Sequence, residues 1–60
     1  MLIKQGSKGS LVEDIQEHLG ITADGIFGPG TARIVKEWQL KNGLTADGIV
    51  GPKTLGKLLG

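Results

Sequence analysis

The sequence contains two copies of one pattern. Residues 21–31, Ile-Thr-Ala-Asp-Gly-Ile-Phe-Gly-Pro-Gly-Thr, return 23 residues later as residues 44–54, and eight of the eleven positions are identical. The same register extends upstream, where residues 11–20 align with residues 34–43. A unit of this size cannot bury an apolar face alone, so the two copies must pack on each other. The repeat therefore predicts one domain over residues 1–60, made of two helix–loop units and a short closing segment.

The first copy has the residues expected of a helix that ends at Gly20. Ser10 and Glu13 have the spacing of a capping box, in which the hydroxyl and the carboxylate each bond a free backbone N–H at the helix start. Apolar residues then recur at helical spacing as far as Leu19. Gly20 supplies a left-handed stop, so we expect the chain to leave the helix there.

Two Gly-Pro pairs, Gly28-Pro29 and Gly51-Pro52, mark the starts of two further helices. Proline is favoured at the first helical position because the N–H that it lacks would have no partner there. Asn42-Gly43 ends the second helix, whose core stripe is expected to consist of Ile34, Val35 and Trp38. The predicted fold class is all-α, a compact three-helix bundle built from a 23-residue helix–loop repeat with Asp-Gly loops between the helices.

Each loop contains an Asp-Gly pair, which is typical of a tight turn because Asp tolerates and Gly prefers a positive φ. The pairs are Asp24-Gly25 and Asp47-Gly48. The isoleucine that follows each pair, Ile26 or Ile49, is expected to point inward and anchor its loop. A glutamine stands eight residues before each Asp, and we expect its amide to hold the loop backbone; these residues are Gln16 and Gln39. Only the segment Gln5–Gly9 resembles a flexible linker.

Composition excludes several classes of protein. A chain of 60 residues buries only about 60% of its extended surface, and without cysteine it has neither disulfides nor a Cys/His cluster for a metal, so we expect no cofactor. Seven basic and six acidic residues give a net charge of +1, too little for a protein that mainly binds the nucleic-acid backbone. No apolar run exceeds three residues, which predicts no membrane insertion. The first four residues are too short for a signal peptide.

The residues reject a calcium module and an enzyme. A paired calcium loop needs several carboxylates per loop, and each loop here has one. The only histidine, His18, has no cysteine or second histidine near it in sequence. Asp24 and Asp47 could be taken for the carboxylate pair of a glycoside hydrolase, but such a pair needs two different pKa values and these residues share one turn environment.

A helical DNA-binding or protein-interaction module is the alternative from another class. Three short helices fit its size, and Arg33, Lys36 and Lys41 lie on the second helix. However, Glu37 follows Arg33 by four residues and can pair with it. The connections are about eight residues long, whereas the helix-turn-helix motif has a turn of three or four.

One longer pattern joins these features. It reads Gly6-Ser7-x-Gly9-x-x-Val12-x-x-Ile15-Gln16, then Asp24-Gly25-Ile26-Phe27-Gly28-x-x-Thr31, then Val35-x-x-Trp38-Gln39-x-x-x-Gly43-Leu44-x-x-Asp47-Gly48-Ile49-Val50-Gly51-x-x-Thr54. This pattern resembles the peptidoglycan-binding domain family of the three-helix type, over nearly the whole chain. Two departures are Ile15, where Leu is usual, and Trp38, where Phe or Tyr is commoner.

The resemblance implies a non-catalytic module that binds bacterial cell-wall peptidoglycan. Its partner would be the stem peptide, with the glycan as a further contact, and it would be a monomer covalently linked to a catalytic domain such as an amidase, lysozyme or peptidase. It would act in the cell wall, outside the cell or in the periplasm, exported through the parent protein or released with a phage lysis system. A weak tether of this kind raises the effective concentration of the enzyme on its substrate.

The expected binding groove is formed by the loops and the second helix. Backbone N–H groups and polar side chains would meet the amides and ammonium groups of the peptide, and basic residues would meet its carboxylates. Leu40 lies off the core stripe, so it is expected to be exposed and to cover apolar parts of the stem. Trp38 is expected to serve the core rather than to stack on sugar. The candidate site residues are Asp24, Gly25, Arg33, Lys36, Gln39, Leu40, Asn42, Asp47 and Gly48.

Overall fold

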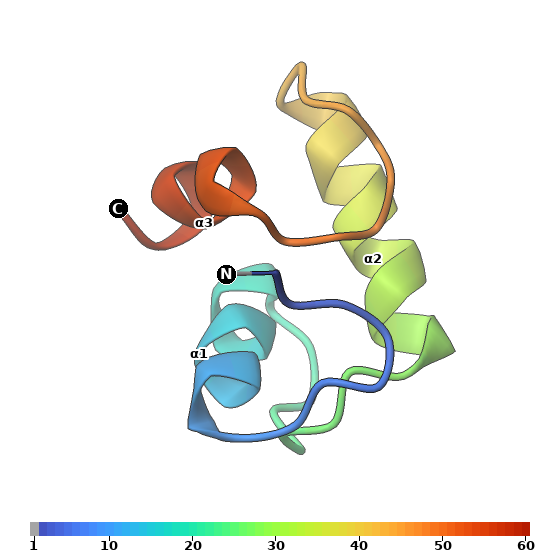
Figure 1. Cartoon of the computed structure of the whole chain (residues 1–60), viewed down its shortest axis with the longest axis vertical. Coiled ribbons are helices and arrows are strands. Elements are labelled where there is room, and N and C mark those ends of the chain that lie inside the picture. The colour runs from blue at the N-terminus through green and yellow to red at the C-terminus, as the bar shows by residue number, and fades with distance from the viewer. Residues whose placement is uncertain (1) are drawn as a thin grey trace.

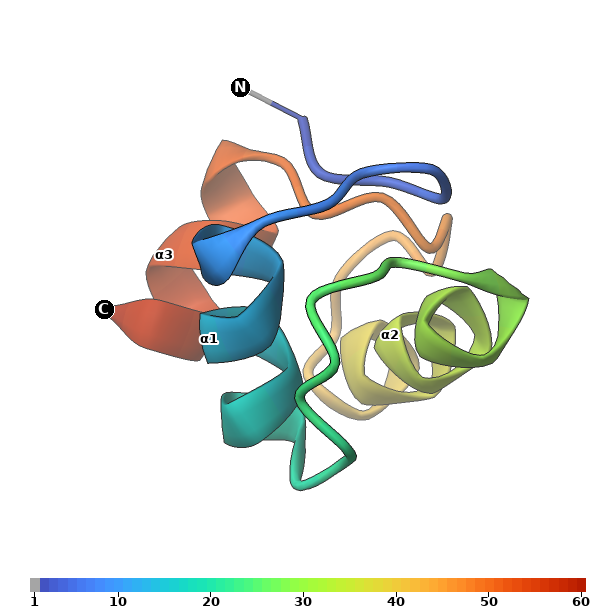
Figure 2. The same cartoon turned by 90° about the horizontal axis from the view of Figure 1, so that it is seen from below.

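Residues 2–60 form three helices, as predicted. The structure is a computed structural model that describes residues 2–60, and its helices are α1 (Ser10–Leu19), α2 (Pro29–Lys41) and α3 (Pro52–Leu59) (Figure 1). α1 packs against both α2 and α3, and α1 and α3 lie side by side with α2 across from them (Figure 2). The all-α fold class is therefore confirmed. No helix in the described part of the chain has the length and apolar character needed to cross a bilayer.

The N-terminal segment is fixed by hydrogen bonds to both loops, so the expectation of a flexible Gln5–Gly9 linker is wrong. Gly6 N donates to Phe27 O at 2.8 Å, and Phe27 N donates to Ser7 O at 2.9 Å. Farther upstream, Ile3 and Val50 exchange both backbone hydrogen bonds, at 3.0 and 2.7 Å. Each loop thus gains a short extended partner, which satisfies backbone groups that the helices leave free.

Among residues 2–60, the core is made of six buried aliphatic or aromatic side chains, drawn from the N-terminal segment, α1, α2 and both loops: Ile3, Val12, Ile15, Phe27, Val35 and Val50. Of the stripe predicted on α2, only Val35 belongs to this core, whereas Ile34 and Trp38 are half-buried. The buried face of α2 is instead Thr31, Val35 and Gln39, spaced four residues apart. Two polar residues occupy core positions of this helix because their side chains form hydrogen bonds inside the protein, which an apolar pattern does not predict.

The residue that anchors each loop is one position later than predicted. Phe27 and Val50 are completely buried, whereas Ile26 is 51% exposed and Ile49 is half-buried. Both loops are extended here, and successive side chains of an extended chain point to opposite sides. Because the isoleucine is on the outer side, its neighbour enters the core.

The predicted capping box at Ser10 and Glu13 is wrong. α1 follows Gly9, and within the described residues no side chain caps its start. The Glu13 N–H bonds Gly9 O at 3.2 Å, while the Glu13 side chain lies over the first Asp-Gly turn, where a Cβ on Gly25 would be 3.2 Å from its Cγ. The Glu13 side chain thus contacts the loop instead of capping the start of α1. The other helix ends are as predicted, with left-handed Gly20 after α1 and prolines at the first positions of α2 and α3.

Candidate functional site

Each Asp-Gly loop is held by one buried glutamine, which confirms the role predicted for Gln16 and Gln39. Gln16 Nε2 lies within hydrogen-bond distance of Asp24 Oδ1 (2.9 Å), Ile26 O (3.0 Å) and Thr31 Oγ1 (3.1 Å), and its Oε1 accepts from Gly25 N at 2.9 Å. We call this set the first clasp. Both glutamines are 1% exposed, so their hydrogen bonds fix the loop without competition from water.

The second clasp repeats the first with the same geometry. Gln39 Nε2 reaches Asp47 Oδ1 (3.1 Å), Ile49 O (3.0 Å) and Thr54 Oγ1 (3.1 Å), and Gly48 N donates to its Oε1 at 3.0 Å. Across residues 2–60, every buried side-chain nitrogen or oxygen has a hydrogen-bond partner. Polar residues are therefore fully satisfied in the interior, as a stable core requires.

The threonines of the clasps were not assigned a role from the sequence. Thr31 and Thr54 are 8% and 6% exposed and each receives a hydrogen bond from the glutamine of its own clasp. Their identity in both copies, 15 residues after the glutamine, was the available signal. An apolar pattern does not mark a threonine in the first turn of a helix as buried.

The two aspartates are ionised turn residues. Asp24 Oδ1 accepts from Ile26 N at 3.0 Å and Asp47 Oδ1 from Ile49 N at 2.9 Å. These backbone hydrogen bonds are the main reason that the pKa of both carboxyls is lowered; the Gln16 amide adds to the effect at Asp24, and Gln39 and Lys36 add to it at Asp47. No hydrogen bond from the described residues reaches Oδ2 of either side chain. Each exposed carboxylate therefore keeps one oxygen that a ligand can use.

Acidification is expected to destabilise the domain through these two carboxylates. Their pKa values in the folded state lie below the ordinary 3.8, so folding favours the ionised form. The resulting stability is present above the unfolded value and is lost as the pH falls below it toward the folded value. We expect the urea midpoint to drop between about pH 5 and about pH 3. The double variant Asp24→Asn/Asp47→Asn keeps the Oδ1 acceptors but cannot titrate. An equal drop in that variant would contradict the assignment.

The charge placed over the turn differs between the two copies. Glu13 and Lys36 occupy equivalent positions in the repeat. A Cβ on Gly25 would lie 3.2 Å from Glu13 Oε2, and a Cβ on Gly48 would lie 3.2 Å from Lys36 Cε. Both glycines have positive φ, 75° and 74°, a turn conformation that favours glycine. The first turn thus has two carboxylates, and the second has a carboxylate with a lysine beside it.

A groove of about 430 Å³ opens beside the second clasp, between the second loop and the first turn of α3. We call it the loop–α3 groove. Leu2, Leu44, Ile49 and Pro52 provide its apolar walls, and the second clasp forms its floor. The remaining lining residues are Gln39, Thr45, Asp47, Gly51, Lys53 and Thr54. Apolar walls with a few polar groups are typical of small-ligand sites, whose volumes are about 300–1,000 Å³.

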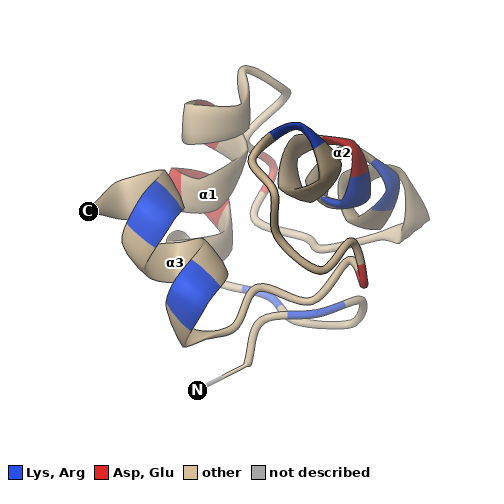
Figure 3. Cartoon of the chain, turned by 90° about the horizontal axis from the view of Figure 1, so that it is seen from above, with Lys and Arg blue, Asp and Glu red and all other residues tan. Residues whose placement is uncertain are grey.

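The charges at this groove come from Asp47 and Lys53. Lys53 was not among the predicted site residues. Lys53 is equivalent to Gly30 of the first copy. The presence of a charged residue in only one of the two copies was the feature of the sequence that could have identified it. α3 carries only lysines as charged residues, Lys53 and Lys57, whereas the charged residues of the neighbouring α1 are all acidic (Figure 3). The α3 wall of the groove is therefore basic.

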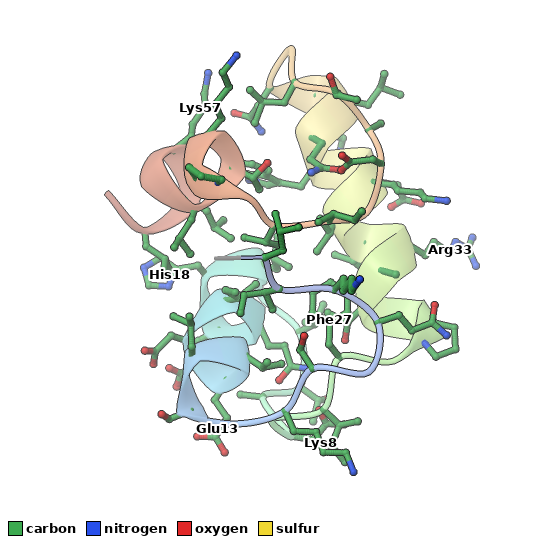
Figure 4. The ribbon with its side chains drawn as sticks, viewed as in Figure 1. Lys8, Glu13, His18, Phe27, Arg33 and Lys57 are labelled. Carbon is green, nitrogen blue, oxygen red and sulfur yellow. The ribbon has the colours of Figure 1, made fainter. Side chains whose placement is uncertain are left out.

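The structure does not bring the nine predicted site residues together. Asp47 and Gln39 line the loop–α3 groove, with Gly48 and Lys36 at the adjoining turn. Asp24 and Gly25 belong to the first turn. Leu40 is 73% exposed, as predicted, and Asn42 Nδ2 donates to Trp38 O at 2.8 Å. Arg33 points away from the body of the molecule on α2 (Figure 4), where its Nε lies 3.7 Å from Glu37 Oε2, the predicted ion pair.

The arrangement offers binding groups. Among residues 2–60, no three His, Cys, Asp or Glu side chains come close enough to hold a metal ion. The loop–α3 groove presents a free carboxylate oxygen, a hydroxyl, an ammonium group and apolar walls. Groups of this kind can bind the ammonium, carboxylate and apolar parts of a ligand.

Comparison with known proteins shows the family. The model of the family described as "Putative peptidoglycan binding domain" matches residues 8–58. No curated protein matches the chain. Among solved structures, the SleB N-terminal domain is 34% identical with a TM-score of 0.93, over 98% of this chain and 89% of that one.

Two larger proteins contain a similar domain. A fused Zn-dependent amidase/peptidase/peptidoglycan-binding domain-containing protein from Clostridium acetobutylicum is 41% identical, with a TM-score of 0.93, over 97% of this chain and 28% of that one. The endolysin of the Burkholderia phage AP3 is 35% identical, with a TM-score of 0.91, over 97% of this chain and 24% of that one. The chain thus spans about a quarter of these two proteins. It belongs to the peptidoglycan-binding domain family, which confirms the prediction of a non-catalytic peptidoglycan-binding module.

Proposed function

We propose that the domain binds the stem peptide of peptidoglycan through the loop–α3 groove. The observation that carries this proposal is that Asp47 and Lys53 both line a groove whose walls are apolar. Stem peptides combine free ammonium and carboxylate groups with short aliphatic side chains. Asp47 Oδ2 would accept from an ammonium or amide N–H, Lys53 would attract a carboxylate, and Leu44 and Ile49 would contact the aliphatic parts.

The lining of the groove favours peptide over glycan. Proteins commonly hold sugar rings against aromatic faces, and the chain has only two aromatic residues. Phe27 is completely buried, and Trp38 does not line the groove. The polar groups at the groove are a carboxylate, a hydroxyl and an ammonium group, which suit a charged peptide. The proposed site therefore keeps Asp47 from the predicted set, adds Thr45 and Lys53, and leaves Gln39 and Gly48 to hold the loop.

The domain would tether a catalytic domain to the cell wall. The chain spans about a quarter of the amidase/peptidase fusion and of the endolysin that contain a similar domain. We infer that it is likewise a monomeric part of a longer cell-wall hydrolase that acts outside the cytoplasm. Weak binding suffices for this purpose, because each contact raises the local concentration of the enzyme on a polymer that presents many sites.

A charge reversal in the groove tests the site. We expect Lys53→Glu to lower binding to purified sacculi at least about tenfold, which corresponds to about 1.4 kcal/mol, as measured by co-sedimentation at low salt. The change leaves the fold intact, since Lys53 is exposed and an acidic residue in the first turn of a helix is favourable.

Lys8→Glu is the matched control. It changes the net charge equally, and Lys8 lies at the far end of the molecule from α3 (Figure 4). We expect it to retain binding within about twofold. Equal loss of binding in both variants would show that net charge, and not the groove, determines binding. A wild-type domain that stays in the supernatant at high sacculus concentration would overturn the function itself.

A further inference from the structure

A second groove lies in the first copy of the repeat. Its volume, about 430 Å³, equals that of the loop–α3 groove. It runs from the start of the first loop along the outer face of α2, and we call it the α2 groove. Its lining residues are Ile21, Thr22, Gly30, Arg33, Ile34 and Glu37.

The two grooves share three equivalent positions of the repeat. Ile21 corresponds to Leu44, Thr22 to Thr45 and Gly30 to Lys53, each 23 residues apart. In both copies, the groove lies between the residues that follow a helix stop and the first turn of the next helix. The aliphatic residue and the threonine at the start of the loop are therefore shared. The α2 groove lacks the clasp residues and the lysine of the other groove, and Arg33, Ile34 and Glu37 of α2 line it instead.

Arg33 supplies a cation in the α2 groove. It lies three residues after Gly30, so the two positions share one face of α2. Its Nε lies 3.7 Å from Glu37 Oε2, and the two side chains are 81% and 57% exposed. This separation is longer than a hydrogen bond, and exposed pairs of this kind are weak. The guanidinium therefore keeps its N–H donors available, and a carboxylate is the group that matches their planar geometry best.

The two grooves face different sides of α2. The floor of the loop–α3 groove includes Gln39, on the buried face of the helix with Thr31 and Val35. Arg33, Ile34 and Glu37 lie on the opposite face, as the 3.6-residue period requires. A ligand in one groove thus leaves the other open, and a polymer that presents many peptides can fill both.

We propose that the α2 groove is a second binding subsite, which takes the carboxylate-bearing end of a second stem peptide from the same wall polymer. This proposal rests on the proposed function of the loop–α3 groove. The aliphatic part of the peptide contacts Ile21 and Ile34, and its carboxylate binds the Arg33 guanidinium. With two subsites occupied, the second contact becomes intramolecular and retention on the wall increases without tighter binding at either groove.

Matched variants separate the two grooves. Gly30→Phe and Lys53→Phe place the same bulky side chain at equivalent exposed positions, and a Cβ on Gly30 would meet no atom within 4 Å. Gly30→Ala is the control, because it adds a methyl group without filling the groove. Arg33→Gln removes the cation and leaves the backbone unchanged. Thermal melting monitored by circular dichroism identifies any variant that does not fold.

NMR titration with a soluble disaccharide–tetrapeptide released from sacculi provides the first readout. We expect amide shifts at Ile21, Thr22 and Ile34 as well as at Leu44 and Thr45. Gly30→Phe and Arg33→Gln should each lose the first set and keep the second, and Lys53→Phe should do the reverse. On intact sacculi, Gly30→Phe and Arg33→Gln should lower retention at least about tenfold, and Gly30→Ala should not.

The outcomes distinguish this proposal from the proposed function. Shifts confined to the second loop and α3, with wild-type retention of Gly30→Phe and Arg33→Gln on sacculi, would overturn the second subsite and leave the first intact. Shifts confined to the α2 groove would assign binding to this groove alone and overturn the loop–α3 site. Absence of shifts at both grooves, together with no binding of sacculi, would overturn both.

Discussion

Replacement of Gln39 by alanine is expected to unfold the domain at 25 °C. The change removes the amide that joins Asp47, Gly48, Ile49 and Thr54. Buried groups without a partner cost about 1–3 kcal/mol each, and a cavity adds to that cost. A domain of this size rarely has more than about 3–5 kcal/mol of stability from its core. Loss of the second clasp is therefore expected to lower the free energy of unfolding to near or below zero.

Urea and thermal unfolding followed by circular dichroism would measure this effect. Gln5→Ala is the matched control, because Gln5 is an exposed glutamine of the N-terminal segment. Leu40→Ala is a second control, since this side chain is 73% exposed. We expect both controls to change the free energy of unfolding by less than about 0.5 kcal/mol. A cooperative transition in Gln39→Ala within about 1 kcal/mol of the wild type would show that water replaces the amide at no cost.

Local signals predicted the helices well. Proline at the first helical position and glycine after the last turn act through backbone geometry alone, so Pro29, Pro52 and Gly20 could be placed from the sequence. Because the pattern occurs twice, each copy independently predicted the same helix boundaries. The capping box failed for the opposite reason, because the Glu13 side chain lies over Gly25, which is distant in the sequence.

Which side chains face the core was harder to predict, because it depends on polar contacts between residues that are 8–15 positions apart in the sequence. Thr31 and Gln39 hold buried positions on α2 through their hydrogen bonds, which moves Trp38 to the margin of the core. In the loops, pairing with the N-terminal segment sets the alternation of the extended chain, so Phe27 enters the core in place of Ile26. An apolar pattern contains neither kind of information.

The candidate site was predictable only in part. Asp47 could be identified because the Asp-Gly pair predicts its turn. Lys53 belongs to α3, a separate element, and only the fold brings it to the same groove as Asp47. A single groove lined by the nine predicted residues requires both loops and α2 to share one surface. The structure separates them because α2 turns one face to the core and the opposite face to the α2 groove.

Replacement of Phe27 by alanine should be the other severe change. Phe27 is the largest completely buried side chain, and it lies between α1 and α2 (Figure 4). Loss of a buried phenylalanine costs about 3–5 kcal/mol, which equals the whole stability expected of a domain this small. Urea unfolding would therefore find no folded baseline at 25 °C.

Two further alanine variants make this prediction specific to the position of Phe27. Ile26→Ala changes the preceding residue, which is 51% exposed, and should cost less than about 1 kcal/mol. Trp38→Ala removes a larger side chain that is half-buried and outside the core cluster, so it should cost less than Phe27→Ala. A larger loss for Trp38→Ala would place the core on the stripe that the sequence pattern indicates. The expected order of destabilisation, Phe27 above Trp38 above Ile26, follows only if the loops and not α2 supply the aromatic part of the core.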